Sequence, residues 1–300
     1  MARQEDQRTD VAQCGYLGIV MEERKLKEIE HSKQRREILQ GFERIADTHA
    51  DSQVGNLDEL VKDKEKFDYH FSNMKYYAVT VASEDYKHKW LGKYCLPGTK
   101  VLDFACGNGE NGIYAATRGA DTIGIDISPE GIVNANKNAE HLGVADRCKF
   151  FAMDGENMTF ENDSFDIAVE YGALHHVDLD AALKELVRVI KPGGRMICVE
   201  ALNHNPLIHW YRRRTPHLRT EWEVEHILGV DSLDVMRRYF GHVEVKFFHL
   251  AVLALVPFRR TFLFRLLLPV FNVIDRLLLS TQFVGKYGWI MIVELAQPRK

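Results

Sequence analysis

Short apolar runs alternate with longer amphipathic segments through the middle of the chain. The apolar runs have the length of strands, and their near-continuous hydrophobicity is typical of strands buried on both faces of a parallel sheet. The segments between them carry apolar residues at helical spacing, so the order predicts a doubly wound α/β fold. The predicted strands are 100–104, 122–126, 148–153, 165–170 and 195–200, and the predicted helices are 76–94, 129–141 and 181–190.

Two more strands are expected late in the domain that we assign to residues 71–300. They lie at 243–250 and 289–295, with an apolar helical insertion at 251–284 between them. The region 247–280 is the most apolar, but five charged side chains keep its uninterrupted runs shorter than the roughly 20 residues of a membrane span. We therefore expect no stable span, and a helix that closes an apolar substrate pocket or forms a subunit contact. A helix lying on a membrane surface is the alternative.

Residues 1–70 differ from the rest of the chain. The segment 22–37 is dense in charges of both signs and has few apolar positions, which indicates a solvated helix. Leu39, Phe42 and Ile45 then give this helix an apolar end that must dock on another surface. Two interpretations stay open: a helical arm or lid exchanged between the subunits of a homo-oligomer, or an extension packed on its own core.

The composition excludes several classes of protein. Of the 300 residues, 46% are hydrophobic and 27% charged, as in an ordinary globular chain, and the formal net charge is −4. That charge, without a basic tail, gives no drive toward nucleic acid. The five cysteines are scattered without C-x-x-C spacing, so we expect no disulfide framework or zinc site, and a reducing, cytoplasmic location. The first residues lack the apolar core of a signal peptide.

The first predicted strand ends in an acid and a glycine turn. Gly107, Gly109 and Gly112 form G-x-G-x-x-G, which alone is a weak indication of a dinucleotide site. Asp103 and Glu110 flank the turn, however, and two carboxylates would repel the pyrophosphate of a nicotinamide coenzyme. They suit a ligand with an ammonium and a sulfonium. The sequence therefore predicts a site for S-adenosylmethionine (SAM), with Asp103 accepting from the methionine ammonium.

Acids also end the second and third strands. Asp126 precedes Ile127 at the end of the second strand, where a carboxylate can accept from both ribose hydroxyls, and Asp154 follows Met153 at the end of the third. Each acid alone could cap the following helix. Together they resemble the class I SAM-dependent methyltransferases, which implies a seven-stranded Rossmann-like sheet ending in an antiparallel pair, and adenine contacts for Met153 and Asp154. The expected cofactor-binding residues are Asp103, Gly107, Gly109, Asp126, Ile127, Met153 and Asp154.

The segment after the fourth strand faces the transferred methyl group in this family. Glu170 lies on the apolar strand beside Tyr171, and we interpret it as a general base. A helix-capping or cofactor-holding acid is the alternative. His175 and His176 leave open a transfer of the methyl group to oxygen or nitrogen.

The segment 201–240 is expected to cap the substrate. It joins Trp210 to a dense run of guanidinium and imidazole groups, and forked guanidinium donors suit a phosphate or carboxylate. A solvated arginine face is the alternative. With the apolar C-terminal region, the combination predicts an amphiphile such as a prenyl diphosphate. The expected substrate-binding residues are His176, Trp210, Arg212, Arg214, His217 and Arg219.

Methylation of an alkene carbon would leave a tertiary cation on its neighbour. Aromatic faces such as Tyr171 and Trp210 stabilise a cation by about 0.5–2 kcal/mol each, and Glu170 would then remove a proton. These segments and the N-terminal arm resemble the terpenoid C-methyltransferases, of the geranyl diphosphate C6-methyltransferase type. The resemblance implies C6 methylation of geranyl diphosphate in terpenoid secondary metabolism. It also implies Mg2+ on the diphosphate, for which His176 and Asn203 are weak ligand candidates.

Three alternatives remain. The chain could methylate an oxygen, nitrogen or carbon of another small terpenoid or aromatic metabolite. It could be a non-enzymatic subunit with the SAM fold that binds a partner through its helical arm. A nicotinamide-dependent dehydrogenase also expects an acid about 20 residues after the glycines, a place that Asp126 nearly fills.

Overall fold

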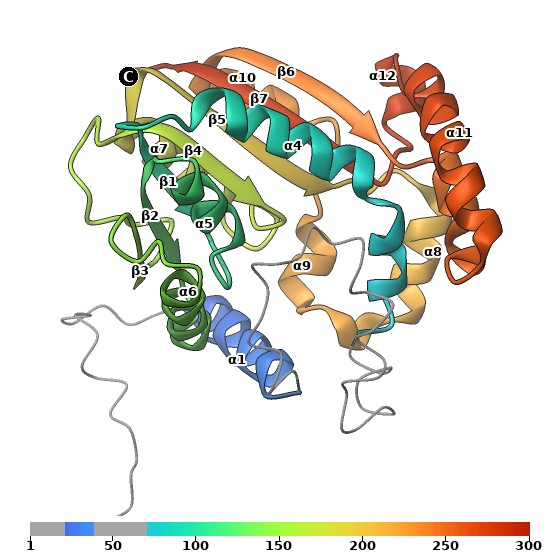
Figure 1. Ribbon diagram of the computed structural model, residues 1–300, viewed down its shortest axis with the longest axis horizontal. Coiled ribbons are helices and arrows are strands. Elements are labelled where there is room, and N and C mark those ends of the chain that lie inside the picture. Colours follow the sequence, from blue (N-terminus) through green and yellow to red (C-terminus); the bar gives the residue numbers. More distant parts are fainter. Residues whose placement is uncertain (1–21, 39–70) are drawn as a thin grey trace, which may run out of the picture.

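The computed structural model describes residues 22–38 and 71–300, and it contains a seven-stranded sheet in the order β3-β2-β1-β4-β5-β7-β6 (Figure 1). Strands β1 to β5 are parallel, and β7 runs antiparallel to both β5 and β6. The predicted doubly wound sheet with a final antiparallel pair is therefore confirmed. The bounds are β1 Lys100–Phe104, β2 Asp121–Asp126, β3 Cys148–Ala152, β4 Phe165–Tyr171, β5 Ile190–Ala201, β6 Phe240–Phe248 and β7 Ile290–Pro298.

Helices cover both faces of the sheet and bury two apolar layers (Figure 1). On one face, Trp90 of α4 packs with Ile197 and Val199 of β5, and on the other, Leu186 of α7 packs with Met196. Because β5 is covered on both faces, its residues from Met196 to Val199 are all apolar and buried. The helices are α4 Val81–Tyr94, α5 Glu110–Thr117, α6 Pro129–His141, α7 Leu179–Val189 and α10 Ser232–Tyr239.

The helix predicted at 76–94 is divided in the structure. A 3-10 helix, η2 (Met74–Val79), precedes α4, and Thr80 separates the two. The Thr80 hydroxyl is buried and donates to the carbonyl oxygen of Tyr77 at 2.8 Å. Threonine bonds of this kind compete with the helical backbone pattern, and this explains the division.

The predicted capping segment and apolar insertion are both helical. The capping segment contains α8 (Pro206–Arg214), η3 (Pro216–Leu218) and α9 (Glu221–His226). The insertion contains η4 (Ala251–Phe258), α11 (Phe262–Leu278) and α12 (Gln282–Gly285), and η4 packs against α11. Within residues 22–38 and 71–300, no helix combines the length and apolar character needed to cross a bilayer.

Helix α1 (Glu23–Ile38) lies beside α6, below the parallel part of the sheet in Figure 1. Its charged sequence was expected to be solvated. Several of its side chains instead contact the domain, as described below. The predicted apolar end at Leu39, Phe42 and Ile45 falls outside the described residues, so a subunit exchange through the arm stays a prediction.

Candidate active site

A cavity of about 780 Å³ opens at the carboxyl ends of the parallel strands. This is the edge where open α/β sheets bind their ligands. Its wall combines the ends of β2, β3, β4 and β5 with side chains from α1, η2, α8, α9 and η4. Segments that precede and follow the parallel strands in the sequence therefore close a pocket that the sheet alone would leave open to solvent.

The glycine turn lies behind the wall of this pocket, on the side where the sequence predicts SAM. Gly107 and Gly109 have φ of 56° and 86°, values that glycine adopts readily and other residues rarely. A Cβ on Gly109 would lie 2.6 Å from the Phe150 ring, so the turn packs too closely for a side chain. The N–H of Gly107 donates to Asp126 Oδ2 at 2.8 Å, which fixes that carboxylate. Neither glycine lines the cavity itself.

The second-strand acid is placed as predicted. Asp126 and Ile127 line the cavity, and Asp126 Oδ1 accepts from the N–H of Ser128 at 2.8 Å. Both carboxylate oxygens are thus held by backbone donors, which leaves their second lone pairs for hydroxyls of a ligand. Ser128 also caps α6 by accepting from the Gly131 N–H.

Asp103 has a different place from the one expected. It is 1% exposed, lies beneath the turn, and accepts from the Gly112 N–H at 2.7 Å through Oδ2. Its Oδ1 has no donor among the residues the structure describes. Burial raises the pKa of Asp103 to about 7, against the opposing effect of the Gly112 hydrogen bond. Because Asp103 does not reach the cavity wall, the structure assigns it to holding the turn on the α5 N-terminus.

Met153 and Asp154 line the cavity at the end of β3, as predicted. Asp154 Oδ2 accepts from Lys25 Nζ at 2.7 Å, and Lys25 also pairs with Glu156 at 2.8 Å. Burial acts against the charge on Lys25, but the bonds to both acids raise its pKa. Arg24 binds the same Glu156 at 2.6 Å. Helix α1 is therefore tied by ion pairs to the loop that follows β3.

The cavity face of α1 was missed by sequence reasoning. Glu28 accepts from Thr220 and pairs with His176 Nδ1 at 3.1 Å, which ties α1 to α9 and to the loop after β4. Charged positions at spacings of three and four residues, as on one face of a helix, were the available signal. The lining residues of α1 are Arg24, Lys25, Glu28, His31, Ser32, Arg35 and Arg36.

Glu170 lies behind the cavity wall and is fully buried, so its role as the general base stays a prediction. Burial, and next the charge of Glu200, raise the pKa of Glu170 well above its ordinary value. Glu170 Oε1 accepts from the Ala173 N–H, and Oε2 meets no donor among the described groups. An oxygen in that position is suited to carry the proton and donate it to Glu200.

Glu200 and His175 border the cavity in front of Glu170, and neither was predicted as a base. Glu200 Oε2 lies 2.6 Å from His175 Nδ1, and Oε1 accepts from the Leu174 N–H at 2.6 Å. Burial acts against the charge of Glu200, but His175 lowers its pKa by charge and hydrogen bonding. The pKa values of the two acids are therefore shifted in opposite directions, that of Glu170 upward and that of Glu200 downward.

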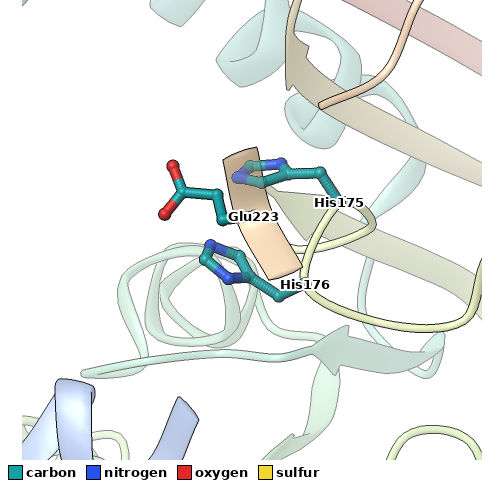
Figure 2. A group of neighbouring side chains, drawn as sticks. All are labelled: His175, His176 and Glu223. Carbon is teal, nitrogen blue, oxygen red and sulfur yellow. The ribbon is translucent and has the colours of Figure 1, made fainter. Parts of the chain in front are cut away.

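His175, His176 and Glu223 converge, with one possible ligand atom of each within 4.8 Å of the others (Figure 2). Two imidazoles and a carboxylate suit zinc or another transition metal, whereas Mg2+ prefers oxygen ligands. Glu223 also pairs with Arg219 Nε at 3.2 Å, and the bond to Glu28 raises the pKa of His176 although burial opposes its charge. These cationic neighbours compete with a metal ion, and the group does not fit the expected Mg2+.

Arginine side chains give another part of the wall a positive charge. Arg212 is buried and donates to the Leu202 carbonyl oxygen at 2.8 Å. Burial, and then the charge of Arg219, lower the pKa of Arg212 to about 10. Arg35 of α1 is close enough to Arg219 for their charges to interact. With Glu223 as the acid paired to Arg219, the three guanidinium groups give this part of the wall more positive than negative side chains, while acids line the wall elsewhere.

The remaining predicted residues divide between the cavity and other places. Tyr171 and Trp210 line it, Tyr171 with Lys87 Nζ 4.5 Å from its ring centre. Arg214 stacks on Trp210, with Cζ 4.1 Å from the ring centre, but it does not line the cavity. His217 does not line the cavity either. The Asn203 amide donates to the Ile227 carbonyl oxygen, which holds the end of β5, so Asn203 is not brought together with His176.

In a comparison with known proteins, residues 101–194 match a family model described as "Methyltransferase domain". The chain is 33% identical over 133 residues to the sterol 4-C-methyltransferase strm-1 of Caenorhabditis elegans, covering 44% of this chain and 39% of that protein. It is 33% identical over 118 residues to the ubiquinone/menaquinone biosynthesis C-methyltransferase UbiE of Bartonella quintana, covering 38% and 45%. The alignments thus span less than half of each relative.

Among solved structures, the [4+2]-cyclase SpnF superimposes with a TM-score of 0.51. It is 17% identical in sequence, and the match covers 73% of this chain and 82% of that one. At this identity the similarity concerns the fold alone.

Proposed function

We propose, from the premise that this chain carries a class I methyltransferase domain, that the protein transfers the methyl group of SAM to a carbon of an anionic isoprenoid. Geranyl diphosphate is the first candidate acceptor. The observation that carries the proposal is the composition of a single cavity. It joins strand-end carboxylates, aromatic walls and three partly or fully buried arginines in one space.

The cofactor side of the cavity fits adenosine. Asp126 and Asp154 offer acceptors for hydroxyl and amino hydrogens, and Ile127 and Met153 offer apolar contacts for a ring. Gly109 packs against Phe150 too closely for a side chain, which holds the turn next to Asp126. When bound, SAM supplies an electrophilic methyl group on a sulfonium, to which a carbon nucleophile forms its new bond as the carbon–sulfur bond breaks.

The acceptor side fits an amphiphile. Arg35, Arg212 and Arg219 provide fork-shaped donors for a diphosphate or another anionic head group. Tyr76, Trp289 and other aromatic side chains, with Leu253 and Ala254 of η4, provide an apolar wall for a tail. The charges of Arg212 and Arg35 each interact unfavourably with that of Arg219, and an anionic head group placed among them would offset this repulsion.

We assign the removal of the proton to His175, oriented by Glu200. If Nδ1–H of His175 donates to Glu200, Nε2 is the acceptor that faces the cavity. Methylation of an alkene carbon leaves a cation on the neighbouring carbon, and loss of a proton from the next carbon to His175 restores a double bond. Glu170, neutral and behind Glu200, acts as a positioning residue.

Mg2+ has no assigned step in this proposal. The resemblance to terpenoid enzymes implies the ion with the diphosphate, but the convergent His175, His176 and Glu223 are a poor set for it. A chelator in the assay decides whether turnover needs the ion at all.

The decisive experiment compares Glu170→Gln with His175→Gln, using labelled SAM and mass spectrometry of the product. Glutamine keeps the neutral donor that we assign to Glu170, so Glu170→Gln should retain activity within about threefold, whereas loss of a general base costs about 100-fold or more. His175→Gln should show that larger loss with SAM binding kept. If Glu170→Gln abolishes turnover and His175→Gln does not, Glu170 is the base after all.

The acceptor is tested in the same assay with a panel of prenyl diphosphates, a prenylated hydroquinone and a sterol. A second candidate function, C-methylation of a quinone or sterol lipid, is favoured by the names of the curated relatives. Arg219→Gln should raise KM for a diphosphate by about tenfold, as loss of a charged hydrogen bond does, while exposed Arg213→Gln should not. Product from the neutral lipids alone would favour the second candidate.

A further inference from the structure

Helix α11 presents an apolar face to solvent that the fold does not cover. Its inner side packs on η4, with Phe264 and Asp275 buried. On its outer side, apolar residues follow one another at spacings of four, four, three and four positions, which places them in one stripe along the helix. We call this stripe the α11 face. Its residues, with the exposed fraction of each, are Phe262 (82%), Leu266 (65%), Val270 (52%), Val273 (55%) and Leu277 (71%).

We propose that the α11 face lies on the surface of an anionic lipid bilayer. In Figure 1, α11 lies at the right-hand edge of the molecule, beyond one end of the sheet and next to η4 and α12. Phe258 and Phe283, both exposed, extend the apolar surface onto those two neighbours. A contiguous apolar surface of this kind on a helix marks a site of interaction rather than ordinary exposure.

The charges around the α11 face select its partner. Residues 251–288 contain five basic residues and one acid, in a chain whose net charge is −4. The acid, Asp275, points inward and accepts from the N–H groups of Leu250, Ala251 and Val252. The exposed charges of α11 itself are therefore arginines, which complement anionic head groups.

The positions of two arginines fit an interfacial helix. Arg265 and Arg276 are exposed and eleven positions apart, so they lie on the same side of α11 at one edge of the α11 face. Long side chains at such an edge reach head groups while the stripe enters the acyl boundary. In a two-fold contact between copies of this chain, the face would meet itself and bring arginine edges near arginine edges. Lipid is the better electrostatic match.

The placement also connects the bilayer to the cavity. Leu253 and Ala254 of η4 line the cavity, while other residues of η4 pack on α11. The apolar wall of the pocket is thus one helix away from the α11 face. An amphiphile held in the leaflet that contacts α11 could enter the pocket with its tail first, without crossing bulk water.

The test is cosedimentation of the full chain with vesicles of phosphatidylcholine, alone or with roughly a third phosphatidylglycerol, at about 0.15 M salt. We expect binding to the anionic vesicles, and at least about tenfold weaker partitioning for Leu266→Asp and for Leu277→Asp. Val133→Asp, on exposed Val133 of α6, is the matched control and should bind like the wild type. Arg265→Gln combined with Arg276→Gln should lower the preference for anionic vesicles.

Two results overturn the proposal. One is the absence of binding to either vesicle with all proteins folded by circular dichroism. The other is a dimer in analytical ultracentrifugation that Leu266→Asp dissociates, which would make a second copy of the chain the occupant. Methyl transfer to a water-soluble short-chain acceptor should be unchanged by Leu266→Asp. A failure of docking therefore leaves the proposed activity standing, and a failure of activity leaves the docking result readable.

Discussion

Replacing Asp103 by asparagine should remove a pH dependence of stability that the fold imposes on this carboxyl group. Asp103 is 1% exposed, and burial raises its pKa to about 7. Asparagine has the same shape and keeps an acceptor for the Gly112 N–H, which Asp103 Oδ2 binds at 2.7 Å. The substitution therefore tests the buried charge with little change in packing.

The sign follows from the direction of the pKa shift. An unfolded chain releases this proton near the ordinary aspartate pKa of about 4, whereas the folded protein retains it until about pH 7. The free energy of unfolding therefore falls as pH rises through that window and is flat above it. Between pH 5 and pH 8 the expected loss from this group is about 2.5 kcal/mol, at about 1.4 kcal/mol per pKa unit.

Urea unfolding of wild type and Asp103→Asn at pH 5, 6, 7 and 8 measures this difference directly. The stability of the variant relative to wild type should rise by about 2.5 kcal/mol from the lowest to the highest pH. Asp146→Asn, at an exposed position, is the matched control for the same substitution on the surface. A constant difference for Asp103→Asn would mean that Asp103 is ionised in the folded protein, and the account of the turn would be wrong.

Three further predictions concern the turn and α1. Gly109→Ala should lower the free energy of unfolding by about 2 kcal/mol or more, because the position combines a φ of 86° with a 2.6 Å contact to Phe150. Gly98→Ala is the control: it has the same backbone strain without the contact, and in thermal unfolding it should cost about half as much. Lys25→Met removes the cation shared by Asp154 and Glu156 and should cost about 1.5–3 kcal/mol in urea, whereas Lys27→Met on the exposed side of α1 should have no measurable effect. Glu28→Gln removes a partner that raises the pKa of His176. The pair contributes to stability below the pKa of His176 and is lost above it, so the variant should lose more stability relative to wild type at pH 6 than at pH 9. Equal losses at the two pH values would contradict a charged His176.

The strands and the cofactor side could be read from sequence because their signals are local. Each strand of the parallel sheet is an uninterrupted apolar run, and the residues at the strand ends follow directly from the strand boundaries. Asp126, Met153 and Asp154 were predicted on that basis, and the structure brings them together at the cavity. The turn at Gly107 was equally local, because left-handed backbone favours glycine.

The arrangement of the two buried carboxyl groups could not be read in the same way. Glu170 and Glu200 each stand among apolar residues near a strand end, on neighbouring strands β4 and β5. Which carboxyl faces the cavity and which lies behind depends on the register of the two strands, in which Glu170 pairs with Cys198. Only the contact between them shows that the pKa of one is raised and that of the other lowered, because a single buried carboxyl group carries no such information.

A charged helix face has the same ambiguity, and α1 resolves it through its partners. The sequence shows that α1 is polar, and polar side chains can be matched by water or by opposite charges on another element. Lys25 is paired with acids more than 120 positions away, at 2.7 and 2.8 Å, and Lys27, two residues on, remains 56% exposed. Lys27 also has a distant acid, Glu221 at 3.6 Å, but that pair is exposed, so the burial of the Lys25 pairs separates the inner face from the outer one. The solvated helix expected from the sequence is thus half correct: its outer side is solvated, and its inner side lines the cavity.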